Sequence, residues 1–125
     1  MSNKSKILII DDDPDILESI KAILSKNGFD TMTAMNGHDG IDAALNKAPD
    51  LILCDMMMEK IDAGSRVAEE LRKKNVSIPI YLLSSIASAT ASNVEIDQLG
   101  FSGILQKPVD PELLVSVIRR SIDKK

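Results

Sequence analysis

Aromatic residues and cysteine are scarce in this 125-residue sequence, which has no tryptophan, one tyrosine, two phenylalanines and one cysteine. The hydrophobic core must therefore be aliphatic, and binding of nucleic acid by stacking bases on aromatic rings is disfavoured. The single cysteine, Cys54, cannot form an internal disulfide. We therefore expect a protein of the cytoplasm.

Long hydrophobic runs are also missing. The opening MSNKSK is followed by only four apolar residues, Ile7 to Ile10, before three aspartates. This pattern is typical of neither a signal peptide nor a membrane span. The net charge of −4 disfavours binding of nucleic acid or an anionic membrane by this domain alone. We therefore expect neither as a direct partner.

The sequence does contain a regular alternation of two patterns. Short aliphatic runs, typical of strands buried on both faces, alternate with amphipathic helical segments. We expect strands at about residues 6–10, 29–34, 50–55, 78–83 and 103–105. We expect helices at about residues 14–27, 37–47, 64–74, 88–99 and 111–122. This order predicts one domain over residues 1–125, a three-layer α/β fold with helices on both faces of a parallel sheet.

Three helix starts carry capping signals, which are Asp13 before Pro14, Asn36, and Asp110 before Pro111. Apolar periodicity then predicts which helical side chains face the core. The expected inward residues are Ile16, Ile20, Ile23 and Leu24 in the first helix, Ile41, Ala44, Leu45 and Ala48 in the second, and Leu113, Leu114, Val117 and Ile118 in the last.

Carboxylates gather at the ends of the expected strands. Asp11 and Asp12 follow the first strand, and Asp55 ends the third. Parallel strands end at one edge of the sheet, where ligands bind in such folds. Carboxylates that share an edge repel one another unless they spread apart or bind a cation, and oxygen ligands suit Mg²⁺. We assign the neighbouring Asp13 to the helix cap rather than to the metal.

Two further groups belong to the same edge. Ser84 follows the fourth strand, and Lys107 follows the fifth. A carboxylate beside Mg²⁺, a lysine and a hydroxyl can act as a nucleophile toward phosphorus. The residues by themselves therefore indicate magnesium-dependent phosphoryl chemistry at this edge.

Four stretches together resemble the receiver domain of two-component response regulators, in family order and over essentially the whole chain. They are ILIIDDDPDIL, PDLILCDMMMEKIDAG, PIYLLSS and ILQKPVD. The resemblance implies a flavodoxin-like (βα)5 doubly wound sheet with strand order 2-1-3-4-5. It also implies a phosphoacceptor switch with at most slow self-phosphorylation and self-dephosphorylation.

The expected partners also follow from the resemblance. A sensor histidine kinase or a histidine phosphotransfer protein would supply the phosphoryl group. A downstream effector protein or domain would read the face formed by the fourth helix, fifth strand and fifth helix. A homodimer through that face is left open.

The resemblance assigns a metal site residue by residue. Asp55 would accept the phosphoryl group and bind Mg²⁺, for which Mn²⁺ can substitute. Asp12 would bind the metal directly, with Asp11 helping. The backbone carbonyl of Met57 would complete the protein ligands.

The resemblance also assigns residues around the phosphoryl group. Ser84 would hydrogen-bond a phosphoryl oxygen, Lys107 would pair with the group, and the Lys107–Pro108 peptide bond would be cis. Met57 and Ile86 flank the group in the family, and since neither can position a water molecule we predict slow self-dephosphorylation.

Several positions of the output face depart from the family pattern. Ile104 stands where the family usually has Tyr or Phe, and Val109 stands where Phe is common. Ser85 is a second hydroxyl beside the expected phosphoryl contact. An isoleucine cannot repeat the rotation of an aromatic ring, so our hypothesis is that signalling relies on ordering of residues 84–93.

Three other functions are weighed against this one. A degenerate receiver would bind partners without phosphorylation. A magnesium-dependent aspartyl phosphatase would use two acids spaced like Asp11 and Asp13, but it also needs a cap region. A flavodoxin-like cofactor binder fits worst, because the loops lack aromatic rings to hold a flavin.

Overall fold

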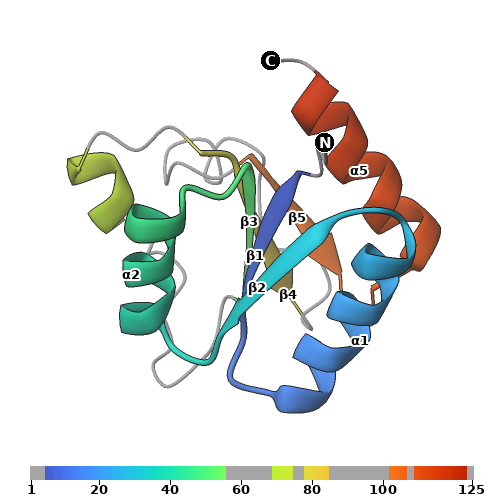
Figure 1. The fold of residues 1–125 in the computed structure, drawn as a ribbon, viewed down its shortest axis with the longest axis horizontal. Helices are drawn as coiled ribbons and strands as arrows, with labels where there is room; N and C mark the ends of the chain where they lie inside the picture. The colour runs from blue at the N-terminus through green and yellow to red at the C-terminus, as the bar shows by residue number, and fades with distance from the viewer. Residues whose placement is uncertain (1–4, 56–68, 75–77, 85–101, 107–108, 124–125) are drawn as a thin grey trace.

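The structure is a computed structural model that describes residues 5–55, 69–74, 78–84, 102–106 and 109–123. Five strands form one parallel sheet in the order β2-β1-β3-β4-β5 (Figure 1), which confirms the expected doubly wound topology. The strands are β1 (Lys6–Ile10), β2 (Asp30–Ala34), β3 (Leu51–Asp55), β4 (Ile80–Ser84) and β5 (Gly103–Gln106).

Helices cover both faces of this sheet. On one face lie α1 (Pro14–Lys26) and α5 (Pro111–Asp123), and on the other lies α2 (Gly37–Lys47) (Figure 1). Residues 69–73 are also helical, and their Leu71 packs on the α2 side. The helix expected at 88–99 and the start of the one expected at 64–74 lie outside the described residues. No helix among the described residues is long and apolar enough to cross a membrane.

The three expected helix caps are present. Asp13 Oδ1 accepts the Asp15 N–H at 2.9 Å, and Asn36 Oδ1 accepts the Asp39 N–H at 2.8 Å. Asp110 Oδ1 accepts an N–H from the first turn of α5 at 3.3 Å. Each cap satisfies a backbone donor that the helix leaves open, and so fixes where the helix starts relative to the preceding strand.

The expected inward faces of the helices are right in part. Leu114 and Ile118 of α5 are fully buried, but Leu113 is 51% exposed, and the prediction for it was wrong. The buried stripe of α5 instead includes Val115, whose position places Leu113 on the opposite side of the helix.

The same kind of error affects the other two helices. In α1, Leu17 is buried although the prediction left it out, while Ile16 and Ile23 lie half-buried at the edge of the core. In α2, Leu45 is 41% exposed and Ala48 is exposed. The buried residues of α2 are small, namely Gly37, Gly40 and Ala44, and the predicted Ile41 packs half-buried against the same core.

Candidate functional site

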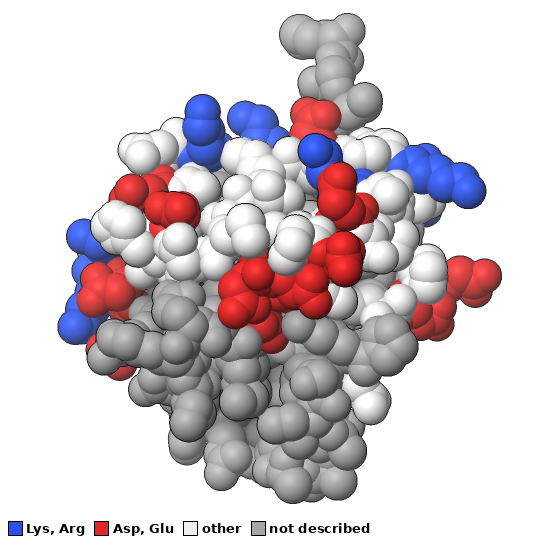
Figure 2. Space-filling model, turned by 90° about the horizontal axis from the view of Figure 1, so that it is seen from below, with Lys and Arg blue, Asp and Glu red and all other residues white. Residues whose placement is uncertain are grey.

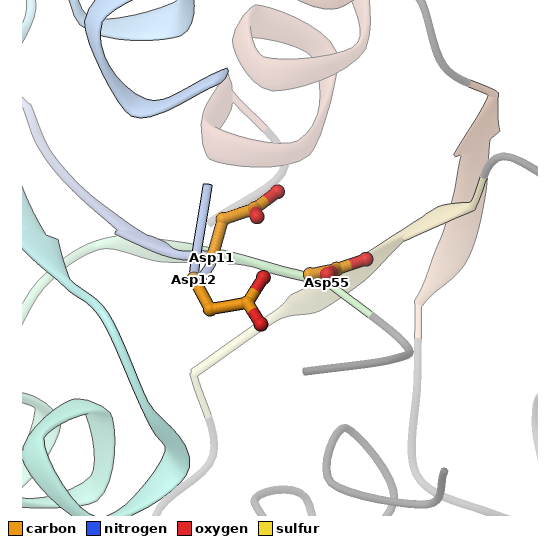
Figure 3. Close-up of side chains that lie close together, drawn as sticks. All are labelled: Asp11, Asp12 and Asp55. Atoms are coloured by element: carbon orange, nitrogen blue, oxygen red, sulfur yellow. The ribbon is translucent and has the colours of Figure 1, made fainter. Parts of the chain in front are cut away.

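Three aspartates meet where the neighbouring strands β1 and β3 end (Figure 3). One carboxylate oxygen from each of Asp11, Asp12 and Asp55 lies within 4.8 Å of the other two. The pairing of Ile10 with Cys54 explains this, because Asp11 directly follows Ile10 at the end of β1 and Asp55 directly follows Cys54 in β3. The expected convergence of these carboxylates is therefore present.

The three carboxylates differ in exposure. Asp11 is 0% exposed and Asp55 is 7% exposed, whereas Asp12 is exposed to solvent. Figure 3 shows Asp12 extending from the end of β1 toward Asp55. Burial of carboxylates is costly unless hydrogen bonds or a cation compensate. The cluster therefore has two buried carboxylates, Asp11 and Asp55, and one, Asp12, that is open to water.

Backbone contacts hold Asp11 in place. Its N–H donates to the Ala34 carbonyl at 3.0 Å, which extends the β1–β2 pairing by one residue. Its Oδ1 accepts the Asp13 N–H at 2.9 Å. Sequence reasoning missed the role of Ala34. Its backbone carbonyl would accept this hydrogen bond with any side chain at position 34, so only the strand register reveals it.

The donor set fits a hard divalent cation. Every ligand atom in the cluster is a carboxylate oxygen, which suits Mg²⁺ or Mn²⁺ and leaves room for water on the exposed side. The view from below in Figure 2 shows acidic side chains gathered near the middle of this face. The histidine of α2, His38, is 85% exposed and is not part of the cluster.

The other expected site residues are only partly covered by the structure. Ser84 is the last residue of β4, beside the end of β3, and its side chain is not described. Met57, Ser85, Lys107 and Pro108 lie outside the described residues, so their expected roles and the cis peptide bond stay predictions.

The two described output residues pack on opposite faces of the sheet. Ile104 of β5 is half-buried against the core on the α2 side, among residues that include Leu82. Val109 is half-buried against the core on the α1 and α5 side. Ile104 therefore belongs to a packed layer of the sheet.

Fold and site together define a class of protein. This is a doubly wound α/β domain with a metal-competent acidic cluster between β1 and β3, at the point where the strand order reverses. Residues 7–119 match the family described as the response regulator receiver domain. The chain belongs to this family of signalling domains.

Individual relatives agree with the family assignment. The chain is 32% identical to the alkaline phosphatase synthesis transcriptional regulatory protein PhoP of Bacillus subtilis strain 168, with 93% of this chain and 49% of that protein covered. It is also 32% identical to the response regulator MprA of a Mycobacterium strain (KMS), with 91% and 49% covered. The chain thus spans about half the length of these curated relatives.

A solved structure shows the same fold. The Francisella response regulator 1452 receiver domain superposes with a TM-score of 0.87 at 28% identity, covering 97% of this chain and 98% of that chain.

Proposed function

We propose that this domain is a phosphoacceptor switch of the cytoplasm, in which Asp55 takes a phosphoryl group in the presence of Mg²⁺. The observation that carries the proposal is the convergence of Asp55 with Asp11 and Asp12, with their oxygens within 4.8 Å. A carboxylate oxygen can attack a phosphorus centre if the charge of the product is compensated. Membership of the receiver family supports a phosphohistidine of a kinase or phosphotransfer protein as the donor.

The transfer exchanges one bond to phosphorus for another. An Asp55 carboxylate oxygen forms the new O–P bond while the P–N bond to the donor histidine breaks, and the donor ring, protonated at its other nitrogen, leaves with the electron pair as neutral imidazole. Asp11, Asp12 and Asp55, with the Met57 carbonyl, would hold the metal. Bound Mg²⁺ would neutralise part of the charge on the phosphoryl oxygens.

The remaining roles concern the phosphorylated state. Ser84 would donate a hydrogen bond to a phosphoryl oxygen, and Lys107, preceding a cis Pro108, would pair with the group. A downstream effector would then recognise the output surface formed by the fourth helix, β5 and α5, to which Ser85, Ile104 and Val109 are assigned. The half-buried packing of Ile104 supports a switch that does not depend on rotation of this side chain.

Two alternatives are distinguished by particular observations. Asp13 directs its Oδ1 to the N–H of Asp15 as a helix cap, which disfavours the phosphatase hypothesis that pairs Asp13 with Asp11. A degenerate receiver that binds partners without phosphorylation is supported only by the departures at Ile104 and Val109. The convergence of Asp11, Asp12 and Asp55 favours the phosphoacceptor instead.

The test is incubation with acetyl phosphate, with and without Mg²⁺, followed by intact mass spectrometry. We expect a gain of one phosphoryl group that requires Mg²⁺ and is lost in Asp55→Asn. Asp42→Asn is the matched control, because it also removes one carboxylate charge but lies on the exposed side of α2. Among the described residues, Asp42 makes its only ion pair with His38. No gain in the wild type would favour the degenerate receiver.

A further inference from the structure

Gly40 of α2 lies against the last residue of β1. A Cβ atom at position 40 would clash most closely with Ile10 Cδ1, and would lie 2.8 Å from Ile10 Cγ1 and 3.2 Å from Ile10 Cγ2. Real Cβ atoms do not approach other carbons this closely, so a side chain at position 40 requires movement of the helix or of Ile10. The branched end of Ile10 therefore occupies the place that any side chain at position 40 would take.

Ile10 has little freedom to move away. It is 0% exposed, and its strand is paired on both sides, so that Ile10 lies between Ala34 of β2 and Cys54 of β3. Its side chain belongs to the packed cluster on the α2 side, together with Ala44 from the next turn of the same helix. A methyl group added at position 40 would therefore push on the end of β1 or push α2 outward.

Either movement reaches the acidic cluster. Ile10 immediately precedes Asp11, whose N–H is bonded to the carbonyl of Ala34. The start of α2 follows closely, since Asn36 caps the helix and its carbonyl accepts the Gly40 N–H at 3.0 Å. The end of β1, the end of β2 and the first turn of α2 thus form one connected unit.

We infer that Gly40 is a positioning residue for the metal site, because its contact with Ile10 sets where β1 delivers Asp11 and Asp12. This inference rests on the proposed function for its metal, but the geometry it invokes involves only residues of this chain. A methyl group at position 40 has two opposing effects on stability, namely better helix propensity and a clash with Ile10. Alanine is favoured over glycine inside helices, so a loss of stability in Gly40→Ala would itself report the clash.

A second crowded glycine provides the matched control. A Cβ atom at Gly103, the first residue of β5, would lie 2.9 Å from Tyr81 Cε2. Gly103 pairs with Tyr81 near the start of β4, at the end of the sheet opposite the aspartates. Gly103→Ala is therefore expected to strain the core without moving the metal ligands.

The experiment measures Mg²⁺ dissociation constants by calorimetry and the backbone amide shifts of Asp11 to Asp13 in the metal-free protein by NMR. Gly40→Ala is expected to weaken Mg²⁺ binding about tenfold and to move these amide signals. Ile10→Val, which removes the closest carbon, should recover part of both effects in the double variant. Gly103→Ala should lower the unfolding temperature but leave both site measurements unchanged.

Each outcome decides between a positioning role and a merely structural one. If Gly40→Ala loses stability but keeps wild-type Mg²⁺ binding and amide shifts, as Gly103→Ala does, the positioning role is wrong. If the wild type binds no Mg²⁺, the proposed function fails, and the amide shifts still decide the role of Gly40. If Gly40→Ala does not fold, Ile10→Val alone loosens the same contact, and unchanged amide shifts in it would overturn the inference.

Discussion

The two faces of the sheet are packed in different ways. On the α1 and α5 side, large aliphatic side chains fill the space, among them Leu24, Leu114 and Ile118. On the α2 side, the helix contributes the small residues Gly40 and Ala44, and Gly40 lies against Ile10 of β1. Large interlocking side chains supply most of the hydrophobic stabilisation, whereas close contact between a helix and a strand end leaves no room for adjustment. We therefore expect the first face to set stability and the second to set the geometry of the site.

The largest predicted effect comes from a substitution in the core on the α1 and α5 side of the sheet. Leu114→Ala removes a fully buried side chain of α5 and should lower the free energy of unfolding by about 2–5 kcal/mol, measured by urea denaturation. Leu113→Ala is the control on the same helix, because Leu113 is 51% exposed, and it should change stability by less than about 0.5 kcal/mol. Equal losses in the two variants would show that the α5 stripe is wrongly placed.

A smaller effect tests whether Asp13 is a cap or a ligand. Asp13→Ala removes the acceptor for the Asp15 N–H and should cost about 1 kcal/mol of stability. Asp13→Asn keeps the cap and should be close to the wild type. Mg²⁺ binding should change little in both, since the Asp13 backbone N–H that supports Asp11 remains. A tenfold loss of Mg²⁺ affinity in both variants would instead make Asp13 a ligand.

The smallest predicted effect is a gain of stability at the end of α2. Ala48 has a φ of 46°, in the left-handed region that favours glycine. Ala48→Gly should therefore stabilise the protein by roughly 0.5 kcal/mol in thermal or urea unfolding. Ala43→Gly, inside the same helix, should destabilise by about 1 kcal/mol. A loss in both variants would contradict the assigned end of the helix.

Sequence patterns predicted the fold well because its signals are local. Strand-like runs such as Ile7–Ile10 and the caps Asp13, Asn36 and Asp110 specify where elements begin and end. Strand order and the roles around the phosphoryl group came from the family resemblance instead.

Helix orientation and close packing were harder to predict. Apolar periodicity placed Leu45 and Leu113 inside because both are hydrophobic, although each is only the sequence neighbour of a buried residue and so points away from the buried stripe. The contact between Gly40 and Ile10 joins residues from different elements, so no local pattern of the sequence reveals it.

A titration of Mg²⁺ into the metal-free protein tests most directly whether carboxylates from β1 and β3 form one metal site. Asp12→Asn removes a charge from the cluster. The control, Asp42→Asn, removes a charge from the exposed side of α2. We predict that the first weakens Mg²⁺ binding at least about tenfold, and that the second leaves it unchanged. Equal affinity in both variants and the wild type would contradict the site.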